Sequence, residues 1–283
     1  MAIKTLICGL SGTGKSTSAR NLKDVAVVNP VNKPLPFKNK FEMLNGVTES
    51  KEIVEFMKNT TKKVIIVDDF QYLLSIPYMR RIKEAGWDKY NDFASNYFDI
   101  INVCDELPDD VTVYFMTHTE TLEDGTETVK LIGKLLREKI CIEGLFTTVL
   151  KTMVNDGKYY FITQNNGHDN VKSPLGMFNS YAIDNDLNYV DEKIRNYYEV
   201  GDNFLSDEDI AEIDKEAERV EIEPPKPKSE RKRRKSREEV EADNDAKVAE
   251  QLQEDQREEV PFEETETPAI ETPPRRRRRR AAE

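Results

Sequence analysis

The sequence predicts an α/β fold with a mainly parallel central sheet that ends in antiparallel strands, followed by a disordered C-terminal tail. Short apolar runs bounded by turn residues alternate with longer segments of helical spacing, and the last two runs flank the turn sequence Asn155-Asp156-Gly157. From about residue 206 onward, charged residues, Pro and Thr dominate, and Phe262 is the last aromatic residue. We therefore expect one domain over residues 1–205 and a mostly disordered tail over residues 206–283.

Six strands are expected in order along the domain. The first four are apolar runs joined by segments of helical spacing, so they should lie parallel in the sheet: residues 5–8, 25–28, 64–67 and 111–116. The last two, residues 146–152 and 159–163, should pair as an antiparallel hairpin through the Asp-Gly turn. A helix is expected near residues 206–220, because Ser206 precedes Asp209 at the spacing of a capping box.

Composition limits the class of protein. The chain has no apolar run near the length of about 18 residues that a membrane span needs and no signal-peptide pattern, so we expect a cytoplasmic protein with no membrane partner. The three cysteines, Cys8, Cys104 and Cys141, lack metal-ligand spacing and are expected to be buried, reduced thiols. The net charge of -12 argues against non-specific binding of nucleic acid by the whole molecule, but it leaves room for local basic patches.

A phosphate-binding motif follows the first strand directly. The segment Gly9-Leu10-Ser11-Gly12-Thr13-Gly14-Lys15-Ser16 matches the pattern G-x-x-x-x-G-K-[ST], whose glycines let successive backbone N–H groups turn toward phosphate. Lys15 is expected to reach the β and γ phosphates, and the Ser16 hydroxyl to ligate Mg²⁺. The alternative is an ordinary glycine-rich turn. The motif predicts ATP and Mg²⁺ as ligands, held by Gly9, Ser11, Gly12, Thr13, Gly14, Lys15, Ser16 and Thr17.

Polar residues also follow the third and fourth strands. The buried run 64–67 ends at Asp68 and Asp69, and Asp68 is expected to hold Mg²⁺ opposite Ser16. The alternative is that both acids only cap the next helix. The fourth strand ends at Thr117 and His118, which would face the γ-phosphate across the same edge of the sheet. The alternative is a structural histidine.

The order of these motifs resembles that of a known family. Together with the later segments Gly133-Lys134-Leu135-Leu136, 146–150 and 171–178, the chain resembles the phage AAA-family ATP-binding proteins, which have a RecA-like P-loop core and are related to the RecA-like class of phage single-strand annealing proteins. The resemblance covers residues 1 to about 200. It implies a RecA-like P-loop NTPase fold and a Mg²⁺-dependent ATPase that acts in DNA recombination, single-strand annealing or replication, in the host cytoplasm if the protein is phage-encoded.

The resemblance also implies roles for single residues. Lys15 is expected to be catalytic, and His118 stands where the family places a polar residue, usually Gln, that senses the γ-phosphate. Lys172 resembles the basic residue that reaches the nucleotide of a neighbouring subunit, and its alternative is a solvated loop lysine. The family usually supplies a catalytic Glu after its second strand, but here that strand ends Val28-Asn29-Pro30. Asp69 is therefore expected to take the catalytic role by orienting water; the alternative is that no residue replaces the Glu and hydrolysis is slow.

Partners are predicted from the same sources. A homo-oligomer is expected, formed through the core or the tail because the chain begins at its first strand. Single-stranded DNA is expected to bind basic and aromatic residues after Asp69, including Arg80, Arg81, Lys83 and Trp87, unless these belong to an amphipathic helix with a packed Trp. The loop 120–128 is acidic and indicates a hairpin turn at 123–126. The basic blocks 231–235 and Arg275 to Arg280 offer a second site for DNA, or for a protein partner such as a single-strand binding protein. The alternative is a solubilising tail with no specific partner.

Three functions remain open at this level. The first is a RecA-like ATPase of DNA recombination or annealing. The second is an ATP-dependent loading or regulatory module that binds another replication protein through its tail. The third is a small-molecule kinase, which shares the phosphate-binding motif but would need a lid over the nucleotide, and no Arg-rich lid is evident in the sequence.

Overall fold

The computed structural model describes residues 1–86, 88–202, 204–218, 222 and 224. By its contacts the chain divides into two units after Pro227, and every described residue lies in the first unit. The predictions for Trp87, for the basic blocks 231–235 and 275–280, and for the order of the tail beyond residue 224 lie outside the described residues.

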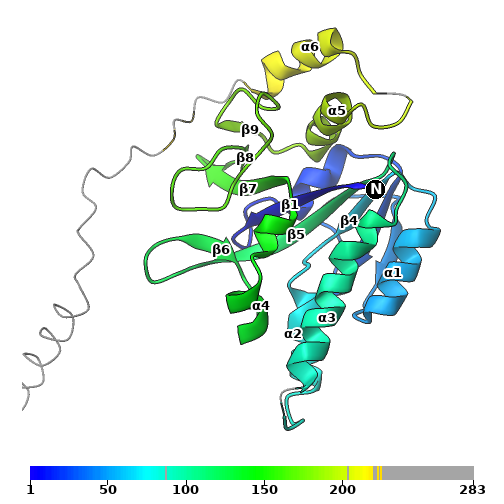
Figure 1. Cartoon of the computed structure of the whole chain (residues 1–283). Coiled ribbons are helices and arrows are strands. Elements are labelled where there is room, and N and C mark those ends of the chain that lie inside the picture. Colours follow the sequence, from blue (N-terminus) through cyan, green and yellow to red (C-terminus); the bar gives the residue numbers. More distant parts are fainter. Residues whose placement is uncertain (87, 203, 219–221, 223, 225–283) are drawn as a thin grey trace, which may run out of the picture. The chain divides into compact units, whose positions relative to one another are not determined.

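One large sheet forms the centre of this unit (Figure 1). Its strand order is β3-β2-β4-β5-β1-β7-β8-β9, with β6 paired to the end of β5. The neighbours from β3 to β7 run parallel, while β8, β9 and β6 pair antiparallel. The strands are β1 (Ile3–Gly9), β2 (Val25–Asn29), β3 (Glu42–Asn45), β4 (Val64–Val67), β5 (Thr112–Thr121), β6 (Glu127–Val129), β7 (Thr148–Asn155), β8 (Lys158–Ile162) and β9 (Ala182–Asp184).

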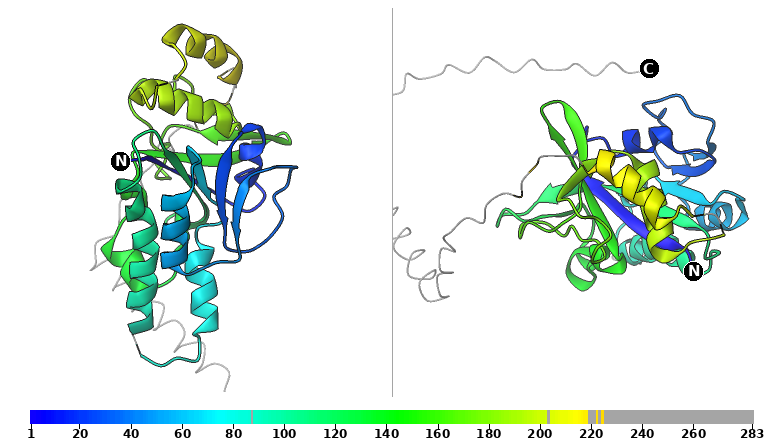
Figure 2. Two further views of the ribbon diagram at one scale, coloured as in Figure 1. Left: turned by 90° about the vertical axis from the view of Figure 1, so that its right-hand side faces the viewer. Right: turned by 90° about the horizontal axis from the view of Figure 1, so that it is seen from above.

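Helices cover both faces of the sheet (Figures 1 and 2). The first face packs on α1, α2 and α3, and the opposite face packs on the 3-10 helix η1 and on α5. Helix α6 contacts α5 and lies on its outer side in both views. The helices are α1 (Ser50–Asn59), α2 (Tyr72–Arg80), α3 (Asp88–Asn102), α4 (Lys134–Lys139), α5 (Leu187–Tyr198) and α6 (Asp207–Ala217), with 3-10 helices η1 (Ser16–Asn21), η2 (Val103–Asp105) and η3 (Ile142–Leu145).

Successive side chains of a strand point to opposite faces of the sheet, which explains why there is a hydrophobic core on each face. Leu6 belongs to the core under α1, α2 and α3, whereas its neighbour Ile7 belongs to the core under η1 and α5. Because both faces are covered, the central strands are mainly apolar, and every residue of β2 and β4 is buried. The mixed α/β architecture with a mostly parallel sheet is therefore as the sequence predicts.

The register of the central strands creates the site. On β1, Gly9 is paired with His118 of β5, and on β4, Val67 is paired with Phe115 of β5. The carboxyl ends of β1 and β4 therefore lie on either side of residues 115–118 of β5, at one edge of the sheet, while β5 continues to Thr121. Polar residues that follow β1 and β4 are brought together there with those of β5.

The six predicted strands are confirmed, with β5 longer than expected. Asp156 and Gly157 have φ angles of 49° and 73°, as a two-residue type I′ hairpin requires. The hairpin at 123–126 is also confirmed, since Leu122 N–H donates to Thr126 O at 2.8 Å. The short strands β3, β6 and β9 were not predicted, because three or four residues carry too little alternation to recognise.

Other predictions have mixed outcomes. Helix α6 begins after Ser206, whose side chain accepts a hydrogen bond from Asp209 N–H, so the capped helix is confirmed. The expected domain boundary at residue 205 falls between α5 and α6. Cys8 and Cys104 are buried as expected, but the prediction for Cys141 was wrong, because it lies exposed just before η3. Within the described ranges, no helix is both long and apolar enough to cross a membrane.

Candidate nucleotide-binding site

The loop that leaves β1 depends on two glycines for its close packing. A Cβ atom on Gly14, which has a φ of +98°, would lie 2.8 Å from Cδ1 of Tyr159 on β8. A Cβ atom on Gly9 would lie 2.2 Å from Oγ1 of Thr152 on β7. Gly12 has a φ of +79° with open space around it, so only its backbone conformation calls for glycine there. The strands β7 and β8 thus press against the loop from one side.

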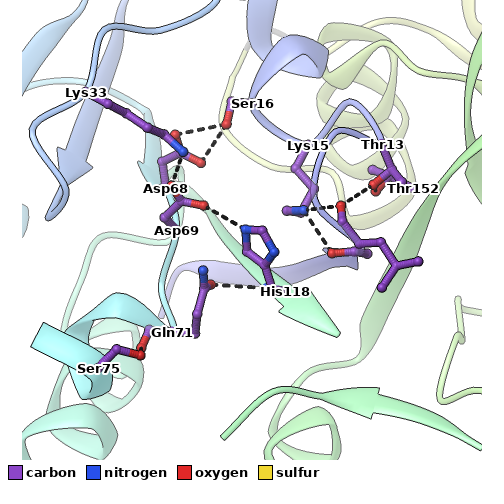
Figure 3. Close-up of polar contacts among 12 residues, drawn as sticks. Thr13, Lys15, Ser16, Lys33, Asp68, Asp69, Gln71, Ser75, His118 and Thr152 are labelled. Carbon is purple, nitrogen blue, oxygen red and sulfur yellow. Dashed lines mark hydrogen bonds and ion pairs between the residues drawn. The ribbon is translucent and has the colours of Figure 1, made fainter. Parts of the chain in front are cut away.

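Lys15 places its ammonium group inside this loop (Figure 3). Its Nζ donates hydrogen bonds to the backbone oxygens of Gly9 at 2.8 Å and Leu10 at 2.7 Å. Burial lowers the pKa of Lys15 to about 8, although the nearby carboxylates of Asp69 and Asp68 act in the opposite direction. The loop therefore holds a partly desolvated cation, which a phosphate group would stabilise.

Ser16 and Asp68 meet directly. The Ser16 hydroxyl donates to Oδ1 of Asp68 at 2.9 Å and lies 3.0 Å from its Oδ2 (Figure 3). Asp68 is fully buried at the end of β4. Burial and the neighbouring charge of Asp69 raise the pKa of Asp68, so a cation at this carboxylate would relieve an unfavourable charge.

The donor set around Ser16 and Asp68 fits Mg²⁺. A hydroxyl and a carboxylate are hard oxygen ligands, and Mg²⁺ is commonly bound by one or two such groups together with water and substrate phosphates. In the part of the chain that the structure describes, no three His, Cys, Asp or Glu side chains gather into a metal site. The ion would therefore be shared between Ser16, Asp68 and the phosphates.

The carboxylate of Asp69 contacts Lys33 and His118. Asp69 is buried in the left-handed conformation with a φ of 54°, a strained conformation for a non-glycine residue. Its Oδ2 forms an ion pair with Lys33, and its Oδ1 lies 3.3 Å from Nε2 of His118 (Figure 3). Burial alone would raise the pKa of Asp69, but the hydrogen bonds from His118 and Lys33 outweigh it and lower the pKa to about 2.

His118 and Thr117 point to opposite faces of β5. The backbone N–H of His118 donates to Oε1 of Gln71 at 3.1 Å, which fixes this part of β5 beside Asp69. Thr117 is fully buried, and its hydroxyl lies on the side of Tyr97 of α3. The hypothesis that Thr117 senses the nucleotide was therefore wrong, because successive residues of a strand alternate between its faces. His118 keeps the position that the sequence predicts.

These residues surround a pocket of about 360 Å³ at the carboxyl edge of the sheet. Three of the predicted residues, Gly9, Thr13 and Asp68, do not line the pocket and lie behind it. The Thr13 hydroxyl donates to the backbone oxygen of Leu10 at 2.7 Å and is hydrogen-bonded to the Thr152 hydroxyl at 2.6 Å. The lining is formed by Ser11, Gly12, Gly14, Lys15, Ser16, Thr17, Lys33, Pro34, Pro36, Asp69, His118 and Tyr159.

Sequence reasoning missed Lys33 and Tyr159. Lys33 belongs to the loop 30–41 after β2, and the only available signal was that β2 ends at the same edge of the sheet. Tyr159 is the second residue of β8, and its position depends on the hairpin folding back beside Gly14. Both contacts arise from tertiary structure.

Lys172 lies elsewhere. Its backbone pairs with Val149 of β7, which is level with Leu6 in the middle of β1, and its side chain does not line this pocket. The role expected for it concerned the nucleotide of a neighbouring subunit, and that remains a prediction.

The cations expected to bind DNA near α2 are largely engaged within the protein. Arg81 forms ion pairs with Glu84 and Asp92, with N to O distances of 2.6 and 3.0 Å. Arg80 donates to Oγ1 of Thr48 at 2.9 Å. Lys83 is exposed, and Trp87 lies outside the described residues. Two acidic partners neutralise the charge of Arg81, which therefore attracts phosphate weakly, so this surface is a poorer DNA candidate than its sequence indicates.

Comparison of the chain with protein-family models and with curated proteins gives no match. The structure itself defines a mixed α/β protein with a large, mostly parallel sheet. Its polar pocket joins the loop after β1 to the acids after β4 and the histidine of β5.

Proposed function

We propose that this chain is a Mg²⁺-dependent ATPase with a RecA-like P-loop core. It would act as a homo-oligomer in the cytoplasm, in phage DNA recombination, single-strand annealing or replication. The observation that carries the proposal is that Lys15 and Ser16 line one pocket and that Asp68 lies directly behind it, where the Ser16 hydroxyl donates to its carboxylate at 2.9 Å. A phosphate-loop lysine, a magnesium-binding hydroxyl and a buried acid are the groups that a bound nucleoside triphosphate needs.

Different residues of the pocket would bind different parts of ATP. Lys15 and the N–H groups of its loop would take the β and γ phosphates, and Mg²⁺ would be held by Ser16 and Asp68. Asp69 and His118 then border the γ-phosphate, because Asp69 follows β4, His118 of β5 lies at the same edge of the sheet, and both line the pocket. Tyr159, whose ring packs on Gly14, offers an aromatic surface beside the loop for the rest of the nucleotide.

The same geometry favours slow hydrolysis. A carboxylate with a pKa of about 2 is a weak general base near neutral pH, so Asp69 would orient the attacking water while the proton leaves to solvent or phosphate. Water attacks the γ-phosphorus, and the bond to the ADP oxygen breaks. Lys33 and His118, which both contact Asp69, lie where they can stabilise charge on the transferred phosphoryl group.

The position of β5 supports a role in which the nucleotide state is sensed. This strand lies between β1 and β4, so His118 stands between the phosphate loop and the acids. Contact with the γ-phosphate would compete with its contact to Asp69 and would be lost with phosphate release. The strand β5 then carries the difference between ATP and ADP toward β6 and its hairpin.

ATP hydrolysis by the full chain, measured with and without single-stranded DNA, tests the proposal. We expect turnover that DNA stimulates and that is lost in Lys15→Ala, while the control Lys51→Ala, an exposed residue of α1, keeps the wild-type rate. Turnover that Lys15→Ala retains would contradict the ATPase site. If the wild type hydrolyses ATP but DNA changes neither turnover nor ATP affinity, the recombination role fails and the partner-loading function becomes the better hypothesis.

A further inference from the structure

A second, larger pocket of about 960 Å³ adjoins the nucleotide pocket. Its walls come from the loop 30–41, from η1 and the residues after it, and from β3. Lys33 and Pro34 line both pockets, so the two sites share one wall. None of the roles proposed above for the bound nucleotide uses this larger pocket.

The second pocket is basic. Its lining contains one acid, Asp24, which is already paired with Lys62. Within the described residues, three of its lysines, Lys23, Lys38 and Lys40, are exposed and have no ion pair. The chain as a whole has a net charge of -12, so this concentration of positive charge is local. The basic side chains of the lining are Arg20, Lys23, Lys33, Lys38 and Lys40.

Two aromatic rings line the same pocket as these cations. Phe37 and Phe41 are half-buried and meet edge to face, with ring centroids 5.9 Å apart and an interplanar angle of 72°. Cations that track a phosphate backbone, combined with aromatic rings on which bases stack, are the combination found in proteins that bind single strands.

We propose that the loop 30–41, together with Lys23, binds single-stranded nucleic acid, with phosphates on Lys23, Lys38 and Lys40 and bases against Phe37 and Phe41. The three lysines are exposed on two separate chain segments and do not converge on one buried point, which suits a strand passing across the surface better than a free nucleotide. This inference rests on the proposed function, since the strand would lie beside the ATP pocket and share Lys33 with it.

The α2 region provides the contrast. Its Arg81 is paired with Glu84 and Asp92, and its Arg80 donates a hydrogen bond to Thr48. Lys38 and Lys40 of the loop, in contrast, have no acidic partner in the described part of the chain. Binding releases counterions only where the protein offers charge that is not already neutralised. The loop 30–41 is therefore the stronger site for phosphate.

Fluorescence anisotropy with a labelled oligothymidylate of about 20 nucleotides tests the proposal on the full chain without ATP. Each neutralised phosphate of a single strand contributes about 0.7 to the salt slope of the affinity, so the double variant Lys38→Ala/Lys40→Ala should lower that slope by about 1.4. Binding near physiological salt should weaken about tenfold. Phe37→Ala should weaken binding with an unchanged slope, because it removes stacking and no charge.

The matched control is Lys51→Ala/Lys215→Ala, which removes two exposed charges from α1 and α6 and should bind as the wild type does. The tail is identical in all variants, so the differences report the loop. Thermal unfolding checks that each variant is folded. Equal binding and salt slope in Lys38→Ala/Lys40→Ala and the wild type would overturn the proposal. Competition by thymidine monophosphate at the same nucleotide concentration would also overturn it, by identifying a site for free nucleotide.

An ATP titration of the same proteins separates the two ideas. If ATP binding needs Lys15 but the loop variants bind the oligonucleotide normally, the strand site fails and the proposed nucleotide site stands. If the loop variants lose the oligonucleotide while the wild type shows no ATP binding, the proposed function fails and the strand site stands.

Discussion

The affinity of the chain for ATP should fall steeply as the pH rises above 8, because the free protein loses the proton of Lys15. Burial lowers the pKa of Lys15 from 10.5 to about 8, even with the carboxylates of Asp69 and Asp68 nearby. Phosphates of bound ATP favour the charged ammonium and return its pKa toward the ordinary value. Binding above pH 8 therefore requires the uptake of a proton.

The size of the effect follows from this difference in pKa. With a pKa of 8 in the free protein and 10.5 in the complex, the dissociation constant for ATP should be about tenfold higher at pH 9 than at pH 7. Proton uptake should be about 0.5 per ATP at pH 8 and about 0.9 at pH 9.

Isothermal titration calorimetry measures both quantities when each pH is run in two buffers of different ionisation enthalpy. The control is Lys15→Arg, because its guanidinium stays charged throughout this pH range. The affinity of this variant for ATP should therefore not change through loss of a proton at residue 15, even if it is weaker than that of the wild type. A wild-type dissociation constant that is flat between pH 7 and pH 9, with no proton uptake, would refute the reasoning that Lys15 is a desolvated phosphate ligand.

Three further predictions follow from the site. Asp68→Asn should weaken Mg²⁺-dependent ATP binding by at least about tenfold. It should not lower the free energy of unfolding, because burial raises the pKa of the Asp68 carboxyl and makes its charge unfavourable in the folded protein; a large loss of stability in urea would contradict this. Gly14→Ala should lower the free energy of unfolding by roughly 1–3 kcal/mol, which is more than the loss in the matched variant Gly12→Ala, because the latter adds backbone strain without a clash. Equal urea midpoints for the two variants would show that the contact with Tyr159 is unimportant. Lys33→Ala should lower the ATP turnover number roughly a hundredfold while exposed control lysines leave it unchanged; wild-type turnover would remove Lys33 from the chemistry.

Local patterns were sufficient to predict the central strands and most of the residues that line the pocket. The buried runs of β1, β2, β4 and β5 are apolar because both faces of a parallel sheet are covered. The placement of Lys15, Ser16 and Asp68 then follows from the rule that ligand-binding residues gather at the carboxyl ends of such strands. These features depend on residues close together in the chain.

The rest of the pocket depends on how distant segments pack. Lys33 reaches Asp69 only because the loop 30–41 folds over the edge of the sheet, and its composition alone does not fix that path. The low pKa of Asp69 follows from this contact and from His118, so the sequence could place the acid but not its state. Arg81 shows the reverse case, since the sequence indicates a free cation where the fold supplies acidic partners from residues 84 and 92.

The most direct test of the central claim is a calorimetric titration of ATP into the full chain at pH 7.5, with Mg²⁺ and with a chelator. The account predicts one site that binds ATP more tightly with Mg²⁺, loses ATP in Lys15→Ala, and loses the preference for Mg²⁺ in Asp68→Asn. Absence of ATP binding by the wild type, or equal binding by Lys15→Ala, would contradict it.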